Sequence, residues 1–383
     1  MKNLMIKKPV ARIQAESGSS ELKRTLGKWN LLSLGIGCII GAGIFVMTGQ
    51  AAAQYAGPAI ILSFVLAGLC CAFAGLCYAE LASVLPVSGS AYTYSYATLG
   101  ELLAWIMGWL LLLEYGVAAS TVAVSWSGYV VSFLNGFGIV IPESLANPTI
   151  ALDHATFDMT LTGGLNLPAL IGILCITALL VVGVKESAIV NNIIVFVKLA
   201  VVILFVLMGV FYINPDNWHP FIPEPTGVSG QYGWEGILRG AGIVFFAYVG
   251  FEAVSTAAQE AKNPQKDMPF GILGSLLVCT LLYMGVAAVL TGVVHYSELS
   301  VPDPMAKAVD AIGLGWFSIL VKIGAIAGLT SVMMVLLFGQ TRIFYTMSKD
   351  GLMPHIFSSV HPKFQTPWKN TMIVGSVVAV VAA

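Results

Sequence analysis

Long apolar segments alternate with short polar ones along almost the whole chain. A membrane-spanning helix needs about 20 largely apolar residues, because it rises about 1.5 Å per residue across a hydrocarbon layer about 30 Å thick. Eight segments meet this requirement, and a ninth begins near Met372 and is cut off at Ala383. The predicted spans are Trp29–Gln50, Pro58–Leu85, Glu101–Phe133, Leu167–Gly183, Ile189–Ile213, Trp234–Ala258, Phe270–Val294 and Trp316–Met347. This pattern predicts an all-α integral membrane protein.

Composition supports the same class. Apolar residues make up 57% of the chain and charged residues 10%, against roughly 45–50% and 25% in ordinary soluble domains. The net charge of −1 gives no reason to expect nucleic acid as a partner. The six cysteines lie inside apolar runs without a CxxC pair, and the five histidines lie outside the span centres. We therefore expect free packing thiols, no metal site and no cofactor.

The basic residues predict an orientation. The first 28 residues form a polar tail with seven Lys or Arg, and they contain no apolar core or cleavage site typical of a signal peptide. Cytoplasmic loops are enriched in Lys and Arg. Placing the tail in the cytoplasm puts six further lysines in cytoplasmic loops: Lys185, Lys262, Lys266, Lys349, Lys363 and Lys369. The opposite loops contain only Lys307. We expect a multi-pass protein of the cell membrane with a cytoplasmic N-terminus.

Two of the predicted spans carry glycine-rich interruptions. The first has four glycines in the nine residues from Gly35 to Gly43, and the sixth has a related passage from Gly242 to Glu252. Each glycine costs a helix about 1 kcal/mol relative to alanine. Interrupted helices at corresponding places in two opposed halves are typical of inverted-repeat transporters. The alternative is close helix packing through the small residues Gly37 and Gly41.

Such breaks would expose helix ends with useful chemistry. A half-helix N-terminus presents free N–H groups that suit a carboxylate, whereas a C-terminus presents carbonyls that suit an ammonium group. An α-amino acid carries both groups. Two antiparallel broken helices can therefore bind its zwitterionic backbone without any charged side chain.

The motifs resemble a known family. The stretches Arg24–Phe45 and Tyr78–Tyr92 are similar to the opening of the amino acid–polyamine–organocation (APC) superfamily, and three later stretches are similar to its other signatures: Phe245–Glu252, Lys262–Pro264 and Ser348–Pro354. The resemblance runs from about Arg24 to the end. It is closest to bacterial members of the cationic amino acid transporter family.

The resemblance implies a LeuT-like fold of two five-helix inverted repeats. By this correspondence, residues 1–28 form the cytoplasmic tail, residues 29–213 the first repeat and residues 234–383 a second repeat that is incomplete, truncated in its ninth transmembrane helix. Because the second repeat is incomplete, the sequence does not establish transport by these 383 residues alone, although both broken helices and the eighth helix are present.

The resemblance also implies a substrate site. The substrate carboxylate would meet the backbone around Gly41, Ala42, Gly43 and Ile44, and its amine would meet carbonyls at Ile40, Phe246, Ala247 and Gly250. Phe246 matches an aromatic residue that closes over the substrate, although Phe245 or Tyr248 could serve instead, or Phe246 could be a core residue. Met333 matches a position that limits room for the substrate side chain; ordinary helix packing is the alternative.

Three charges inside the spans are candidates for function, because a charge at a helix centre costs at least about 2.5–3.5 kcal/mol. Lys198 matches the place where proton-coupled relatives put an ammonium group between the first and eighth helices. Glu114 could take part in coupling or sense substrate charge, or could simply bond a neighbouring helix. Glu252 could cap the inner half of the sixth helix or contact a cationic side chain.

The sequence thus favours a secondary active transporter, a permease that moves amino acids by alternating access. The expected activity is proton-coupled uptake of small neutral or cationic L-amino acids, or both. An amino-acid exchanger and a sensor that binds without net flux are the alternatives. No nucleophile–base pair, metal cluster or phosphate loop supports a membrane enzyme. The expected partners are the amino-acid substrate, protons and membrane lipid, and a small accessory membrane subunit of unknown identity stays open.

Overall fold

The computed structural model describes residues 6–11, 13, 26–85, 89–152, 159–161, 163–182, 185–362, 364 and 366–383. Most of the predicted tail lies outside these residues, including Arg24, and so do Pro86 and Lys363. The helices are α2 (Lys28–Ile39), α3 (Thr48–Ala51), α4 (Ile60–Val84), α5 (Ser90–Thr98), α6 (Glu101–Asn135), α7 (Glu143–Ala146), α8 (Leu167–Val182), α9 (Lys185–Gly209), α10 (Gly233–Val244), α11 (Pro264–Val293), α12 (Pro304–Ala311), α13 (Gly315–Lys349) and α14 (Trp368–Ala382).

Short 3-10 and π-helical segments join or extend these helices. They are η1 (Gly43–Met47), η2 (Ala52–Ala56), η3 (Gly57–Ala59), η4 (Val210–Tyr212), η5 (Pro215–Trp218), η6 (Phe245–Tyr248), η7 (Phe251–Glu260), η8 (Tyr296–Glu298) and η9 (His355–Ser358). The first and sixth predicted spans are each built from several such pieces, which is where the sequence has its glycines.

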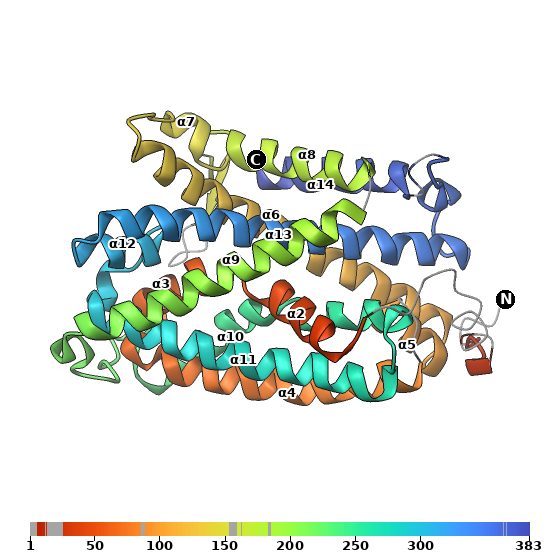
Figure 1. Ribbon diagram of the computed structural model, residues 1–383, viewed down its shortest axis with the longest axis horizontal. Coiled ribbons are helices and arrows are strands. Elements are labelled where there is room, and N and C mark those ends of the chain that lie inside the picture. The colour runs from red at the N-terminus through yellow and green to blue at the C-terminus, as the bar shows by residue number, and fades with distance from the viewer. Residues whose placement is uncertain are drawn as a thin grey trace.

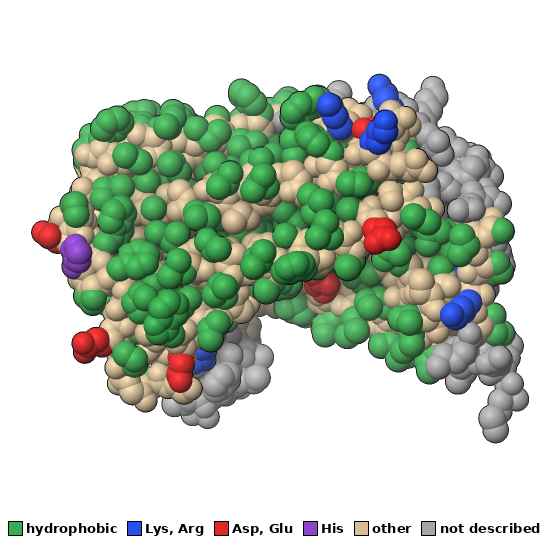
Figure 2. All heavy atoms as spheres, turned by 90° about the horizontal axis from the view of Figure 1, so that it is seen from below, with side chains coloured by type: hydrophobic (Ala, Val, Ile, Leu, Met, Phe, Trp, Pro, Cys, Tyr) green, Lys and Arg blue, Asp and Glu red, His purple; other side chains and the backbone are tan. Residues whose placement is uncertain are grey.

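Six helical stretches of the described chain are long and apolar enough to cross a membrane: Gly43–Val84, Glu101–Asn135, Ile193–Tyr212, Gly233–Ala258, Pro264–Val293 and Gly315–Lys349. The helices α8 and α14 are apolar but shorter. Figure 2 shows a flank on which hydrophobic side chains cover most of the surface and charged side chains form only a few small groups. An apolar belt of this kind is what a bilayer requires of the surface that it covers.

A small β-hairpin interrupts the helical architecture. Strand β1 (Ile150–Leu152) pairs antiparallel with β2 (Met159–Leu161), with Ala151 opposite Thr160, in the loop between α7 and α8. The hairpin has no signal in the sequence, because strands of three residues are too short to give a recognisable alternation. The fold is otherwise helical, as predicted.

The helices form two groups (Figure 1). In one group α4 packs along α11, and α11 also contacts α2 and η7. In the other group α6 packs along α13, and α14 packs against α8 and α6. Helix α9 crosses obliquely between the groups and contacts both α13 and α11. The interrupted helices α2–η1 and α10–η6–η7 belong to the first group: α10 packs against α4, η1 contacts η6, and α2 also contacts α13 of the second group.

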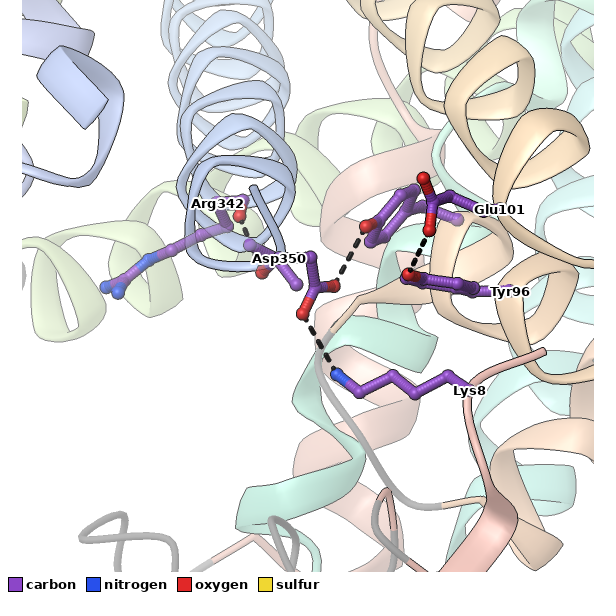
Figure 3. Close-up of polar contacts among 7 residues, drawn as sticks. Lys8, Tyr96, Glu101, Arg342 and Asp350 are labelled. Atoms are coloured by element: carbon purple, nitrogen blue, oxygen red, sulfur yellow. Dashed lines mark hydrogen bonds and ion pairs between the residues drawn. The ribbon is translucent and has the colours of Figure 1, made fainter. Parts of the chain in front are cut away.

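The N-terminal segment docks on one end of this bundle, which we call the tail end. The Lys8 ammonium lies 3.1 Å from Asp350 Oδ1 at the end of α13, and the Tyr92 hydroxyl of α5 donates to Asp350 Oδ2 at 2.8 Å (Figure 3). Backbone bonds fix the same segment, from Lys8 N to Tyr96 O and from Glu101 N to Ile6 O. Burial and the neighbouring Asp350 raise the pKa of Tyr92, so its hydroxyl stays a donor. The tail thereby links α5 and α6 to α13.

We expect Lys8→Gln to loosen this contact, because the shorter neutral side chain leaves the largely buried Asp350 with one partner fewer. Hydrogen bonds to charged groups contribute about 1.5–3 kcal/mol. Amide hydrogen exchange over residues 6–13 should therefore speed up about tenfold or more. The neighbouring exposed Lys7 gives a matched control, since Lys7→Gln should leave exchange unchanged. Equal exchange in the two variants would show that the ion pair does not hold the tail.

Candidate functional site

The first interrupted helix breaks where the four glycines predict it. Helix α2 ends at Ile39, Ile40 adopts an extended conformation with ψ 105°, and the chain becomes helical again at Ala42 and η1. Two sets of backbone groups are exposed by this break. One set is the carbonyls at the end of α2, and the other is the first N–H groups of the next helical segment, before Ile44 and Phe45, whose N–H groups donate to Gly41 O.

The second interruption lies at Val249 and Gly250, between η6 and η7. Val249 has ψ 131°, and Gly250 has φ 109°, a left-handed conformation that favours glycine. A Cβ added at Gly250 would also lie 3.2 Å from Cys38 Cβ and 3.2 Å from the Cys38 carbonyl oxygen in α2. Both the left-handed backbone and this tight contact favour glycine here, and the contact shows that the two breaks lie side by side.

The two interrupted helices touch directly where Gly43 of η1 meets Ala247 of η6. A Cβ added to Gly43 would lie 2.3 Å from Ala247 Cβ and 2.7 Å from Ala247 Cα. Contacts this short do not occur between real Cβ atoms, so only glycine allows this approach. The first residue of η1 is therefore in direct contact with the backbone of η6.

A small cavity of about 20 Å³ lies at this junction. Five of the predicted site residues line it: Gly41, Ala42, Gly43, Phe246 and Ala247. The rest of the wall consists of apolar residues from α2, α6, α13 and the end of η6: Ile39, Ala118, Val122, Val249, Val332 and Leu336. Among the described lining residues none is charged. The cavity has room for about one water molecule, so an amino acid can enter only if the walls move apart.

The remaining predicted residues lie elsewhere. Ile40, Ile44 and Gly250 are buried beside the cavity without lining it, and Met333 is buried in α13 while its neighbours Val332 and Leu336 face the cavity. Phe245 is 43% exposed. Tyr248 is buried and its hydroxyl donates to Phe64 O at 3.1 Å.

The two predicted acids differ from each other. Glu252 is 3% exposed, and its Oε2 accepts from the Gly250 N–H at 3.0 Å, which is the capping arrangement considered from the sequence. Its Oε1 is buried without a hydrogen-bond partner among the described residues. Glu114 lies on an exposed part of α6 and does not line the cavity.

Lys198 lies in the interior and joins three helices. Its side chain extends from α9 and is fully buried. The ammonium group donates to the carbonyl oxygens of Gly37 (2.5 Å) and Ile40 (2.8 Å) at the end of α2, and to Ser331 Oγ of α13 (3.0 Å). All three partners are neutral oxygens, so the exposed carbonyls of the broken helix solvate the charge.

Other contacts of the site gave no signal in the sequence. The Tyr283 hydroxyl of α11 lies 2.8 Å from Ile39 O and 2.7 Å from Ala247 O, and so bridges the two breaks. Ser331 and Tyr283 are ordinary span residues by composition, and only the fold brings them to the glycine-rich segments. In α6, the run of small residues around Ala118 is the sequence signal that could have indicated a cavity wall.

At the end opposite the tail, the segment Pro302–Pro304 packs against α6 and α3. Pro302 lies against Gly128 of α6, and Pro304 lies against Gly49 of α3. Between them, Asp303 accepts a short hydrogen bond from Ser132 of α6. The Tyr129 hydroxyl donates to Phe45 O at 2.7 Å and ties α6 to the outer half of the first broken helix.

These features define a membrane permease in which two interrupted helices meet beside a buried cavity. The chain belongs to the amino acid permease family, whose profile matches residues 26–383. It is a transport protein and not an enzyme. This membership confirms the resemblance to the APC superfamily.

Similar proteins cover most or all of the chain. It is 49% identical to the methylthioribose transporter of Bacillus subtilis over its full length, spanning 79% of that protein. It is 48% identical over 97% of its length to the branched-chain amino acid permease BcaP of the same organism, spanning 77% of it. It is 42% identical over 91% of its length to the chloroplastic cationic amino acid transporter 9 of Arabidopsis thaliana, spanning 59% of it.

The fold also matches a solved transporter. The crystal structure of MhsT in complex with L-phenylalanine superposes with a TM-score of 0.64 at 15% identity, covering 94% of this chain and 79% of that one. This likeness concerns the fold alone. It supports the LeuT-like inverted-repeat fold that the sequence implied.

Proposed function

We propose that this protein is a secondary active transporter that takes up small L-α-amino acids together with protons, with its N-terminus in the cytoplasm. The observation that carries the proposal is the contact of Gly43 with Ala247, which brings the ends of two broken helices to one uncharged cavity. The N–H groups of Ala42 and Gly43 can bind the substrate carboxylate, whereas the Ile44 N–H, which was also expected to take part, donates to Gly41 O at 3.2 Å. Carbonyls around Ile40 and Phe246 can bind its ammonium group.

The repeats proposed for this mechanism are residues 29–213 and 234–383. Rocking one group of helices against the other around the cavity would expose it first to one side and then to the other. The Pro302–Pro304 corner would close the outside and the docked tail the inside. Uptake of a radiolabelled amino acid into liposomes containing the full-length protein tests this activity. Binding without uptake would favour a sensor, and uptake only against preloaded amino acid would favour an exchanger.

The substrate is proposed to be small and neutral, cationic, or both, because the described cavity wall offers apolar side chains and backbone groups. Relatives named for branched-chain and cationic amino acids agree with a site that binds the common backbone. We expect a tenfold excess of alanine to compete with arginine uptake. Unchanged arginine uptake would rule out the small neutral substrate.

Methylthioribose is the second candidate, suggested by the relative that is 49% identical. This ligand has neither the carboxylate nor the ammonium group that the two broken helices could bind. Competition by methylthioribose, with no competition by alanine, would replace the amino-acid assignment while keeping the transport class.

Met333 provides a prediction on specificity. It is fully buried in α13 next to Val332, and Val332 lines the cavity whereas Met333 does not. We expect Met333→Ser to let Val332 withdraw and to improve uptake of larger side chains relative to alanine by about tenfold, which corresponds to about 1.4 kcal/mol. An unchanged ratio of rates would assign Met333 to helix packing alone.

A further inference from the structure

Asp303 lies between the two prolines of the corner that packs on α6 and α3. It directly precedes α12, which lies at the end of the bundle opposite the N-terminus (Figure 1). Pro302 rests on Gly128 of α6, and Pro304 rests on Gly49 of α3. Because both neighbours are held in this way, the packed corner brings an acidic side chain into the contact with α6.

The partners that α6 offers to this acid are hydroxyl groups. The Asp303 carboxylate accepts the short hydrogen bond from Ser132. Tyr129, three residues earlier on the same helix, donates its hydroxyl to Phe45 O at 2.7 Å and is engaged there. A single neutral donor replaces only part of the hydration that a carboxylate has in water.

The charged groups near Asp303 compensate its charge only in part. Lys322 of α13 attracts the carboxylate, and Asp310 of α12 repels it. Lys307 of α12 pairs instead with Glu298, at 3.3 Å. In the part of the chain that the structure describes, no cation lies within ion-pair distance of Asp303. Packing the corner with this carboxylate ionised is therefore unfavourable compared with packing it neutral.

The direction of the proton linkage follows from burial. Burial raises the pKa of Asp303 in the packed corner, although Ser132 and Lys322 act in the opposite direction. An aspartate open to water has a pKa of about 3.9. The packed corner therefore holds the proton more tightly than an open corner does. Proton binding favours packing, and packing weakens as the pH rises above the ordinary pKa of aspartate.

We propose that Asp303 is a second proton-binding site, separate from Lys198, and that its carboxylate takes up a proton from water when the corner packs against α6. The neutral carboxyl can both donate to and accept from Ser132, whereas the ionised form only accepts. Because α12 also contacts η1 and α3, acid on this side closes the corner over the first broken helix. The proposal rests on the proposed function only in calling this side the outside.

The reactivity of a cysteine beneath the corner tests the proposal. Val309 of α12 is 1% exposed, so the thiol of Val309→Cys becomes accessible to water when α12 lifts. The full-length protein is kept in detergent without substrate, and its reaction with the anionic reagent methanethiosulfonate ethylsulfonate is followed from about pH 5 to about pH 8. Reaction of the native cysteines is measured without Val309→Cys and subtracted.

Asp303→Asn, combined with Val309→Cys, keeps the size of the side chain but cannot ionise. At about pH 8 the thiol should react at least about threefold faster with Asp303 intact than in Asp303→Asn, and the two rates should approach each other as the pH falls. Their ratio at each pH cancels the titration of the thiol itself. An ionised Asp303 repels the anionic reagent, so its charge cannot imitate the expected acceleration.

Two further variants assign the effect to the contact with α6. Asp310→Asn removes an exposed acid of the same helix and should retain the pH dependence of the parent protein. Ser132→Ala removes the hydroxyl that stabilises the ionised form of Asp303, so it should speed the reaction most at about pH 8. A pH dependence that disappears in Asp310→Asn and persists in Asp303→Asn would assign the proton to Asp310 and overturn the proposal.

Two other results would also contradict it. A faster reaction in Asp303→Asn than in the parent protein at about pH 8 would mean that the charge of Asp303 holds the corner in place. Equal rates at every pH would mean that packing of the corner binds no proton on this residue. The assay needs no transport, so a protein that shows the expected labelling but no uptake into liposomes would contradict the proposed function alone.

Discussion

Substitution of Lys198 by alanine is expected to abolish amino-acid accumulation driven by a pH gradient. With one proton carried per substrate, an inward gradient of one pH unit supports about tenfold accumulation, since one pH unit corresponds to about 1.36 kcal/mol. In Lys198→Ala the ratio of internal to external substrate should stay near one. The measurement is uptake into liposomes with an imposed proton gradient, with and without sodium.

The reason lies in the Ile40 carbonyl. Its oxygen accepts from the Lys198 ammonium and, in the proposed mechanism, also from the substrate ammonium, which is feasible because a carbonyl has two lone pairs. Loss of the proton from Lys198 would change the hydrogen bonding of the carbonyls that face the substrate. Proton and substrate would thus affect each other's binding reciprocally.

A second variant separates the loss of charge from the loss of packing. Lys198→Met keeps most of the side-chain volume but leaves Gly37 O and Ile40 O without the ammonium group. It should bind alanine at least partly while failing to accumulate it. Accumulation that requires sodium, or that persists unchanged in Lys198→Ala, would leave Lys198 as a tether between helices and remove it from proton coupling.

Gly43→Ala is expected to have the second large effect, a loss of about tenfold to a hundredfold in uptake. The added methyl would overlap Ala247 Cβ and Cα, at 2.3 and 2.7 Å, and backbone on both sides prevents an easy retreat. Overpacking of this kind costs typically about 1–3 kcal/mol. The two broken helices would be pushed apart at the point where substrate is proposed to bind.

Gly242→Ala supplies the matched control. Gly242 is an exposed glycine of α10, a few residues before Ala247 in the sequence. A Cβ added at Gly242 meets nothing within 4 Å. Alanine also favours the helix by about 1 kcal/mol. Uptake by Gly242→Ala should equal that of the parent protein. Equal activity of Gly43→Ala and Gly242→Ala would show that the close contact at Gly43 is dispensable, and the broken-helix site would need revision.

The sequence predicts the helical fold well, because the length of an apolar segment is set by the thickness of the membrane. It predicts the breaks equally well, because glycines inside a span oppose the helix and are visible in any single sequence. The hairpin around Ala151 and Thr160 and the contact of Lys8 with Asp350 were not predictable. The first is too short for a pattern, and the second joins residues 342 positions apart.

The side walls of the cavity escape prediction for another reason. Val122, Val332 and Leu336 are apolar residues in helices that are apolar on every face, so nothing distinguishes the face turned to the cavity from the face turned to lipid. Met333 shows the consequence. Family resemblance points to Met333, whereas the structure places Val332 and Leu336 of the same helix on the cavity wall.

The small volume of the cavity has a consequence for energy conservation in the cell. A carrier that held an open, water-filled chamber between its two sides could conduct protons or sodium ions through that water at each movement of its helices. Here the walls meet until about one water molecule fits in 20 Å³, and the ammonium of Lys198 is shielded by carbonyls on its own side of the break. A cavity of this size holds too little water to carry ions past the two breaks, so leakage at this point would need the same movement of the walls that admits the substrate.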